Sequence, residues 1–318
     1  DTDLALAIGT KLADFTTASW TNFQNENFKL VSVNTSRFDT VKHRAFPVVS
    51  DAKIGLKELS KALGDWRAPN GWYQRAIEEK IKWEEYVAKE SGPTNQELPS
   101  YAHAVGAVYR NSDPSDIVVT AAGGLVGEVV QIWKPKEINT FETEWGFSCM
   151  GYEISGALGI KMAKPDQDVV VFVGDGSYLL QNSDIYSSVL YDKKLIIVVC
   201  DNGGHMVINR LQLAKGGKEY LCNLNAAGAT NLQFVDFEAH AKSMGANAET
   251  VKSTSELEAA FKRAKASDKT YVISMKTDGY EWLEGTAFWD SPTLQVSSTK
   301  ENKAAYEEFL DGKNKQRK

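Results

Sequence analysis

The chain has 318 residues, of which 42% are hydrophobic and 25% charged, and its formal net charge is −6. This is the composition of an ordinary globular protein, with enough length for one large domain or two. The acidic balance and the lack of a basic cluster argue against nucleic acid as a partner. No apolar run reaches the ~20 residues that a membrane-spanning helix needs.

The first 65 residues alternate between apolar, strand-like runs and helical stretches. Strands are predicted at residues 4–8, 29–33 and 47–51. A helix that Ser50 or Asp51 would cap follows them and ends near Gly64. This alternation predicts part of a Rossmann-like middle domain over residues 1–65. Because residue 1 is Asp and a buried strand follows almost at once, we expect the chain to begin inside a domain whose first half is missing.

Residues 66–92 combine many charges with several aromatic side chains. Their helically spaced pattern predicts a charged surface helix that acts as a connector. A second domain with an α/β fold is expected over residues 93–318, ending in a charged C-terminal tail. Its predicted strands are 116–120, 169–173, 195–200, 248–251 and 271–275. Its predicted helices are 101–109, 152–162, the segment between the second and third strands, one from Asp236 or Phe237, and one that Ser255 begins with Glu258 in a capping box.

Three stretches of this domain leave alternatives open. The glycine-rich turn at residues 123–127 is a weak dinucleotide motif, and it fits a diphosphate-binding loop better. Residues 212–225 predict a polar loop near a ligand. The aromatic stretch 277–292 either folds over the site or forms an aromatic plug at the surface.

Two of the predicted strands, 169–173 and 195–200, are unbroken β-branched runs. Such runs predict buried, parallel neighbours whose carboxyl ends meet at one edge of the sheet, where open α/β sheets bind ligands. The first run ends at Gly-Asp-Gly-Ser and the second at Asp-Asn-Gly-Gly. Asp175 offers a carboxylate and Asn202 an amide oxygen, ligands that suit Mg²⁺, and the glycines let backbone approach a phosphate. The pattern predicts magnesium with a diphosphate; the alternative is two ordinary Gly/Asp turns.

These two motifs resemble the signature of thiamine diphosphate enzymes, GDG followed at the usual distance by a pair usually written NN. The resemblance implies that the side chains of Asp175 and Asn202 and the carbonyl of Gly204 bind the magnesium ion. The first Asn of the pair is replaced by Asp201, which leaves these three positions intact. A parallel sheet flanked by helices, the thiamine diphosphate-binding fold, is the implied architecture.

The resemblance also assigns positions around the cofactor. Met150 stands where the family carries a large apolar side chain between the cofactor's two rings, although core packing is the alternative for any methionine. The Ser148 carbonyl would accept from the cofactor's amino group. The diphosphate would contact Gly124, Gly176 and Ser177. His205 stays open between a metal or acid–base role and a loop position near the diphosphate.

Over essentially its whole length the chain is similar to the thiamine diphosphate hydrolases of trihydroxycyclohexane-1,2-dione in inositol catabolism. The segments EWGFSCMGYE, FVGDGSYLLQNSDIYSSVLY and DGYEWLEGTAFWD carry this similarity. It implies hydrolytic C–C cleavage of a cyclic polyol dione to 5-deoxy-glucuronate, with thiamine diphosphate and Mg²⁺ as cofactors. It also implies an N-terminal pyrimidine-binding domain, from the same protein or a second subunit, and a homodimer or homotetramer. No catalytic residue can be assigned from this chain.

Other functions fit the same motifs. An acetolactate-synthase-like carboligase or decarboxylase would use the same cofactor, and a fragment lacking the pyrimidine domain would bind cofactor without catalysis. A nicotinamide enzyme using the glycine-rich turn is a third alternative. The three cysteines, Cys149, Cys200 and Cys222, are widely spaced and include no CxxC pair, which predicts free thiols in a reducing cytoplasm.

Overall fold

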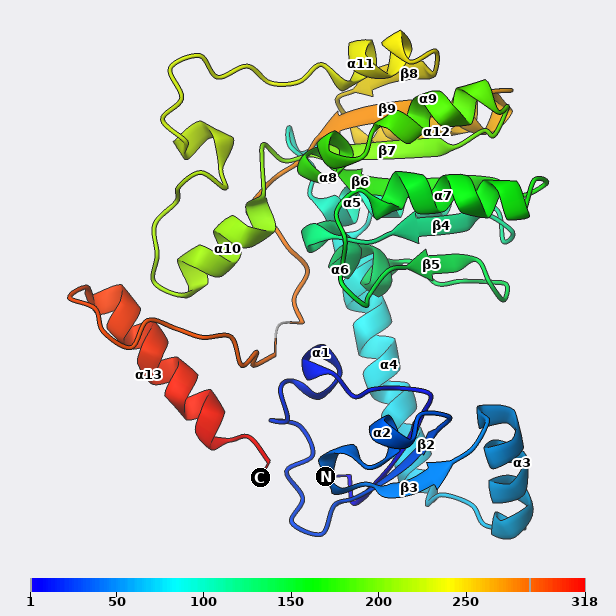
Figure 1. Ribbon diagram of the computed structural model, residues 1–318, viewed down its shortest axis with the longest axis vertical. Helices are drawn as coiled ribbons and strands as arrows, with labels where there is room; N and C mark the ends of the chain where they lie inside the picture. The colour runs from blue at the N-terminus through cyan, green and yellow to red at the C-terminus, as the bar shows by residue number, and fades with distance from the viewer. Residues whose placement is uncertain (1, 286, 318) are drawn as a thin grey trace. The chain divides into compact units, whose positions relative to one another are not determined.

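The computed structural model of the chain describes residues 2–285 and 287–317 (Figure 1). The chain forms two compact units, one of Asp1–Glu78, Lys215–Gly217 and Gly285–Lys318, the other of Glu79–Ala214 and Lys218–Glu284. Helix α4 (Asn70–Glu90) contains the boundary between residues 78 and 79. Within the described residues, no helix is both long enough and apolar enough to cross a membrane.

The first unit contains a three-stranded parallel sheet in the order β1-β2-β3. Its elements are β1 (Leu4–Ile8), α1 (Asp14–Thr17), β2 (Lys29–Asn34), α2 (Arg37–Thr40), η1 (Lys42–Arg44), β3 (Phe46–Val49), α3 (Ala52–Leu63) and α13 (Lys300–Asn314). As predicted, Asp51 caps α3, because its side chain accepts from the N–H groups of Lys53 and Ile54. The C-terminal segment belongs to this unit as well: the Arg317 guanidinium donates to the carbonyls of Phe23 and Phe28.

The second unit contains a six-stranded sheet in the order β5-β4-β6-β7-β9-β8, in which every pairing is parallel (Figure 1). The strands are β4 (Ile117–Thr120), β5 (Phe141–Thr143), β6 (Val169–Gly174), β7 (Ile196–Asp201), β8 (Asn247–Val251) and β9 (Tyr271–Lys276). The helices are α5 (Tyr101–Arg110), α6 (Gly123–Ile132), α7 (Tyr152–Ala163), α8 (Asp175–Leu180), α9 (Ser183–Leu190), α10 (Met206–Ala214), η2 (Leu224–Ala226), α11 (Phe237–Ser243) and α12 (Thr254–Ala266). The parallel sheet flanked by helices confirms the predicted fold class.

Both faces of this sheet are buried, which is why its central strands are continuous apolar runs. Helices α5, α6 and α12 supply one apolar core, and α7, α9 and α11 supply the other. The central strands are fully buried along most of their length, and Phe172 and Ile196 face the first core while Val171 and Ile197 face the second. The carboxyl ends of β6 and β7 are therefore held rigidly side by side.

Several local predictions were wrong. The single helical segment after β6 is two helices, α8 and α9, and strand β5 was not predicted. The glycine-rich turn is the first turn of α6, and the start of the predicted loop 212–225 lies within α10. Ser253 rather than Ser255 caps α12, with its hydroxyl accepting from the Glu256 N–H at 3.2 Å. The Ser-x-x-Glu spacing occurs twice in succession, and the earlier copy begins the helix.

Candidate functional site

The tips of β6 and β7 meet, because Gly174 on β6 is in register with Cys200 on β7. Asp175 follows β6 at the start of α8, and Asn202 and Gly204 follow β7. The Gly204 N–H donates to Asp175 Oδ2 at 2.7 Å. The structure thus brings two of the three predicted metal-binding positions into direct contact and places the third on the same turn.

Each of the three positions offers an oxygen. Asp175 is buried, and burial followed by the neighbouring Asp201 raises the pKa of its carboxyl to about 7. The Asn202 Oδ1 atom is buried and has no hydrogen-bond partner within the described residues. Gly204 forms an isolated antiparallel bridge with Asn223 that uses the Gly203 carbonyl and the His205 N–H, and so the Gly204 carbonyl lies outside the bridge.

This arrangement fits a hard divalent cation. A buried carboxylate beside a second carboxylate, and a buried amide oxygen without a donor, are both costly unless a cation compensates them. No cluster of three His, Cys, Asp or Glu side chains that could hold a metal occurs among the described residues. A metal here would therefore use one carboxylate, one amide and backbone or phosphate oxygens, which is the ligand mixture that Mg²⁺ accepts.

Asp201, which replaces the first Asn of the usual pair, has a separate role. Its Oδ2 forms an ion pair with Lys276, the residue in register with it on β9. Its Oδ1 accepts from the Gly203 N–H at 3.0 Å. The carboxylate therefore stabilises the turn after β7 and is neutralised by Lys276.

Gly176, Met150 and His205 lie together beside this turn. A Cβ atom on Gly176 would lie 2.6 Å from the His205 ring and 3.5 Å from Met150 Cε. The structure thus places His205 against the first turn of α8. Met150 is 38% exposed, so it is not a core methionine. A side chain at position 176 would clash with the imidazole unless the ring moved.

Ser148 lies in the loop before Met150, in the left-handed region with φ 52°. Its hydroxyl donates to the Ala121 carbonyl at 2.9 Å, which ties the loop to the end of β4. The Glu144 carboxylate orders the same loop from outside, since it accepts from the N–H groups of Phe147 and Cys149 at 2.8 and 2.9 Å. The loop conformation that presents Ser148 and Met150 is therefore held by two independent contacts.

The sequence did not single out Glu153, which connects three parts of the site. It is fully buried at the start of α7. Its carboxylate accepts from the Ala122 N–H at 3.1 Å, the Gly151 N–H at 2.9 Å and the Ser177 hydroxyl at 2.8 Å. The Ser177 hydroxyl in turn accepts from the Gly151 N–H at 2.8 Å. Ser177 is thus committed to the protein through its hydroxyl, and only its backbone remains for a ligand. A lone Glu inside a helical pattern gives no signal of such a role.

The sequence around these strand tips matches a known family. Residues 121–275 match the family described as thiamine pyrophosphate enzyme, C-terminal TPP binding domain, thiamine pyrophosphate being a synonym of thiamine diphosphate. Residues 121–275 therefore match a thiamine diphosphate-binding domain, and the chain as a whole is similar to thiamine diphosphate enzymes. The predicted relationship is confirmed by whole-chain relatives as well as by this domain.

The chain is 34% identical, over 96% of its length, to the 3D-(3,5/4)-trihydroxycyclohexane-1,2-dione hydrolase of Halalkalibacterium halodurans. A protein of the same name from Listeria monocytogenes is 35% identical over 97% of the chain. The chain covers 52% of each of these proteins, so it spans about half the length of the curated relatives it matches.

A solved structure shares the fold. It is the thiamine diphosphate-dependent 4-hydroxybenzoylformate decarboxylase of Rhodococcus jostii RHA1, which superposes with a TM-score of 0.60 over 80% of this chain and 44% of that one. Its sequence identity is 16%, so this likeness concerns the architecture alone.

Within the matched domain, Gly124 lies beneath an aromatic side chain. A Cβ atom on Gly124 would lie 2.1 Å from the Trp282 ring, so the indole packs directly on the α6 backbone. Trp282 therefore covers the glycine-rich turn that the sequence predicts as the diphosphate loop. Further along the aromatic stretch, Phe288 instead packs on Gly312 of α13 within the first unit, and residue 286 lies outside the described residues.

Glu128, one turn further along α6, is a buried acid next to Trp282. It is 3% exposed, its Oε1 accepts from the Leu283 N–H at 3.2 Å, and its Oε2 has no partner within the described residues. Burial raises the pKa of its carboxyl to about 7, against the opposing influence of the Leu283 N–H and of Arg210.

This raised pKa predicts a pH-dependent stability. The folded chain binds the Glu128 proton more tightly than the unfolded chain, in which the pKa is near 4.5. The contribution of this proton to the free energy of unfolding is fully present below about pH 4.5 and is lost as the pH rises through about 7. Glu128→Gln cannot ionise, so we expect it to be more stable than the wild type at about pH 8 by on the order of 1–3 kcal/mol, and not at about pH 4.5. Urea unfolding at both pH values measures this, and the same difference at both would contradict it.

Proposed function

We propose that this chain is the diphosphate-binding half of a hydrolase that cleaves a C–C bond of 3D-(3,5/4)-trihydroxycyclohexane-1,2-dione and yields 5-deoxy-glucuronate in inositol catabolism. The observation that carries the proposal is the meeting of Asp175 with the Asn202–Gly204 turn, where a buried amide oxygen has no partner. The names of the whole-chain relatives supply the substrate.

In this proposal Asp175, Asn202 and the Gly204 carbonyl hold Mg²⁺. Gly124, Gly176 and the backbone of Ser177 contact the diphosphate. Met150 supports the cofactor between its rings, and the Ser148 carbonyl accepts from its amino group. Bound thiamine diphosphate would supply the electron sink for cleavage next to a ketone. The residues of this chain hold and orient the cofactor. The Trp282 side chain, which packs over Gly124, restricts access of water to the diphosphate side of the cofactor.

We further propose that the site is completed by an N-terminal pyrimidine-binding domain, from the same protein or from a second subunit of a homodimer or homotetramer. The cofactor binds across such a boundary in this proposal, because the described residues supply candidates that hold the metal, the diphosphate and one side of the rings, and none that is assigned a catalytic role. All three cysteines are free thiols, which supports a reducing compartment such as the cytoplasm.

An assay of the chain combined with the N-terminal half of a relative tests the proposal. With Mg²⁺ and thiamine diphosphate, we expect the mixture to hydrolyse the cyclic dione and to leave pyruvate unchanged, as measured by product analysis. Carboligation or decarboxylation of pyruvate would favour the acetolactate-synthase-like alternative. Cofactor binding without turnover of either substrate would favour a non-catalytic role. The chain alone, without its complement, is the matched control and should be inactive.

A further inference from the structure

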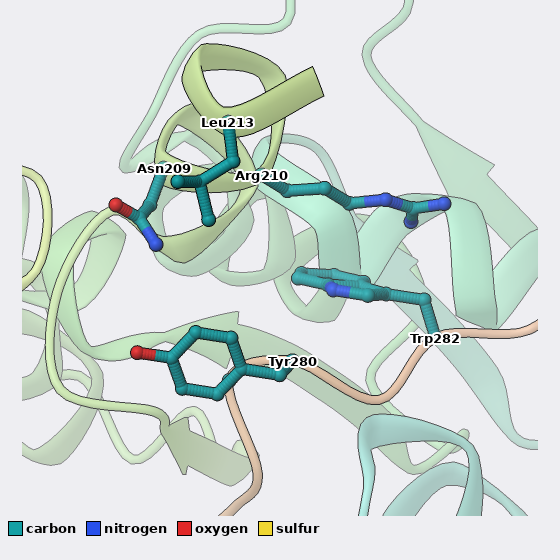
Figure 2. Close-up of a pocket in the computed structure, with 6 residues that line it drawn as sticks. Asn209, Arg210, Leu213, Tyr280 and Trp282 are labelled. Atoms are coloured by element: carbon teal, nitrogen blue, oxygen red, sulfur yellow. The ribbon is translucent and has the colours of Figure 1, made fainter. Parts of the chain in front are cut away.

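The second unit contains a pocket of about 330 Å³ between α10 and the segment that follows β9. Its lining residues are Asn209, Arg210, Leu213, Gly279, Tyr280 and Trp282 (Figure 2). Small-molecule sites span roughly 300–1,000 Å³, so this volume admits a ligand of sugar size and is too small for a dinucleotide.

The pocket adjoins both halves of the candidate cofactor site. On one side, a Cβ atom on Gly279 would lie 3.3 Å from the Asn202 carbonyl oxygen. On the other side, Trp282 rests directly on Gly124. A ligand in this pocket would therefore be separated by a single layer of residues from the metal turn and from the diphosphate loop.

The walls of the pocket are fixed by a polar network. The Glu219 carboxylate accepts from the Tyr280 hydroxyl at 2.6 Å and from Asn209 Nδ2 at 2.9 Å. Asn223, which forms the bridge with Gly204, donates to the Tyr280 hydroxyl at 2.9 Å. The Tyr280 ring and α10 are thus held relative to the metal turn before any ligand binds, which lowers the entropy cost of binding.

Arg210 supplies a cation whose N–H groups form no hydrogen bond or ion pair within the described residues, although its charge acts on the buried Glu128 carboxyl. Its guanidinium lies 5.1 Å from the centre of the Trp282 ring and extends over the indole in Figure 2. Within residues 2–285 and 287–317, no hydrogen bond or ion pair joins it to an acceptor. Arg110 and Arg263 in the same unit each bind a glutamate. A half-buried guanidinium stacked on an indole, with its N–H groups unused, is a preformed partner for a carboxylate.

Asn209 belongs to the frame of the pocket, and the two aromatic rings supply its apolar walls. Asn209 is 1% exposed, and its Oδ1 has no partner within the described chain although its Nδ2 binds Glu219. The Oδ1 atom is itself buried and points away from Arg210 and Trp282 in Figure 2, so a ligand in the pocket does not reach it. The faces of Tyr280 and Trp282 offer apolar surface for the C–H faces of a polyol.

We propose that this pocket binds a small polyhydroxylated carboxylate of the sugar-acid class, with Arg210 on its carboxylate and Tyr280 and Trp282 against its carbon skeleton. This inference rests on the proposed function, because hydrolysis of a neutral cyclic dione creates a carboxylate in the product. Arg210 then distinguishes the charged product from the neutral substrate.

Calorimetric titration of glucuronate into the chain tests this assignment, with glucose as the neutral comparison. We expect glucuronate to bind more tightly than glucose and Arg210→Gln to weaken glucuronate binding roughly tenfold or more, with glucose affected much less. Arg210→Lys keeps the positive charge but loses the planar guanidinium, so its affinity for glucuronate should lie between those of the wild type and Arg210→Gln. Arg263→Gln removes an equal charge elsewhere in the unit and should bind as the wild type does. Circular dichroism checks that each variant is folded.

Two results would overturn the inference: no glucuronate binding by the wild type, or equal binding by the wild type and folded Arg210→Gln. Titration of thiamine diphosphate with Mg²⁺ into the same proteins shows whether the pocket assignment or the proposed cofactor binding has failed. If the cofactor binds but glucuronate does not, only the pocket assignment fails. If glucuronate binds in the Arg210-dependent way and the cofactor does not, the pocket assignment stands and the cofactor assignment fails.

Discussion

The Asp175→Ala variant should lose magnesium-dependent binding of thiamine diphosphate. Asp175 is the only carboxylate among the proposed ligands, and loss of even an outer-shell partner of a metal site typically costs about 10–100-fold in affinity. We therefore expect a loss of at least about 100-fold, measured by calorimetry with cofactor and Mg²⁺ together. The fold should persist, because without a cation the buried Asp175 carboxyl next to Asp201 is a cost rather than a support.

Asp201→Asn is the matched control for this experiment. It also removes one carboxylate from the turn, and it restores the Asn that the signature usually carries. The Asn oxygen can still accept from the Gly203 N–H. The variant loses the ion pair with Lys276, but the Lys276 side chain is half exposed, so this loss costs little. We expect cofactor affinity within a few-fold of the wild type. Unchanged affinity in Asp175→Ala, or equal losses in the two variants, would contradict the metal assignment.

The sheet could be predicted from the sequence because its strands are buried on both faces. Residues 169–173 and 195–200 are continuous apolar runs, and this pattern has few explanations other than neighbouring parallel strands. The approach of Asp175 to the turn after β7 followed from that pairing. Strand β5 could not be found in the same way, because it has three residues and none of them is fully buried.

Contacts between distant segments were beyond sequence reasoning. The packing of Trp282 on Gly124 joins positions far apart in the chain, and neither residue carries a local signal of the other. Arg210 lies in helix α10, which was not predicted, so its position over Trp282 also emerged only from the structure. Periodicity predicts which face of an element is buried, but not which side chain lies against it.

The Glu153→Ala variant should be strongly destabilised and should lose cofactor binding as a consequence. The change leaves the Ala122 N–H and the Ser177 hydroxyl without their acceptor in a fully buried place, and leaves the Gly151 N–H with only its bond to the Ser177 hydroxyl. Each orphaned buried group costs about 1–3 kcal/mol, so we expect a loss on the order of 3–5 kcal/mol. Domain stabilities are about 5–15 kcal/mol, so this is a large fraction of the total. Thermal and urea unfolding measure it.

Glu153→Gln separates the hydrogen bonds from the charge. Its amide oxygen can accept from the Ala122 N–H and its amino group can donate to the Ser177 hydroxyl, while the Gly151 N–H keeps its bond to that hydroxyl, so most of the contacts survive without an ionisable group. Burial raises the pKa of the Glu153 carboxyl, which indicates that the charge itself is a burden there. We therefore expect Glu153→Gln to stay within about 1–2 kcal/mol of the wild type. If Glu153→Ala unfolds at the wild-type midpoint, the three segments that carry Gly124, Met150 and Ser177 are held together by other contacts.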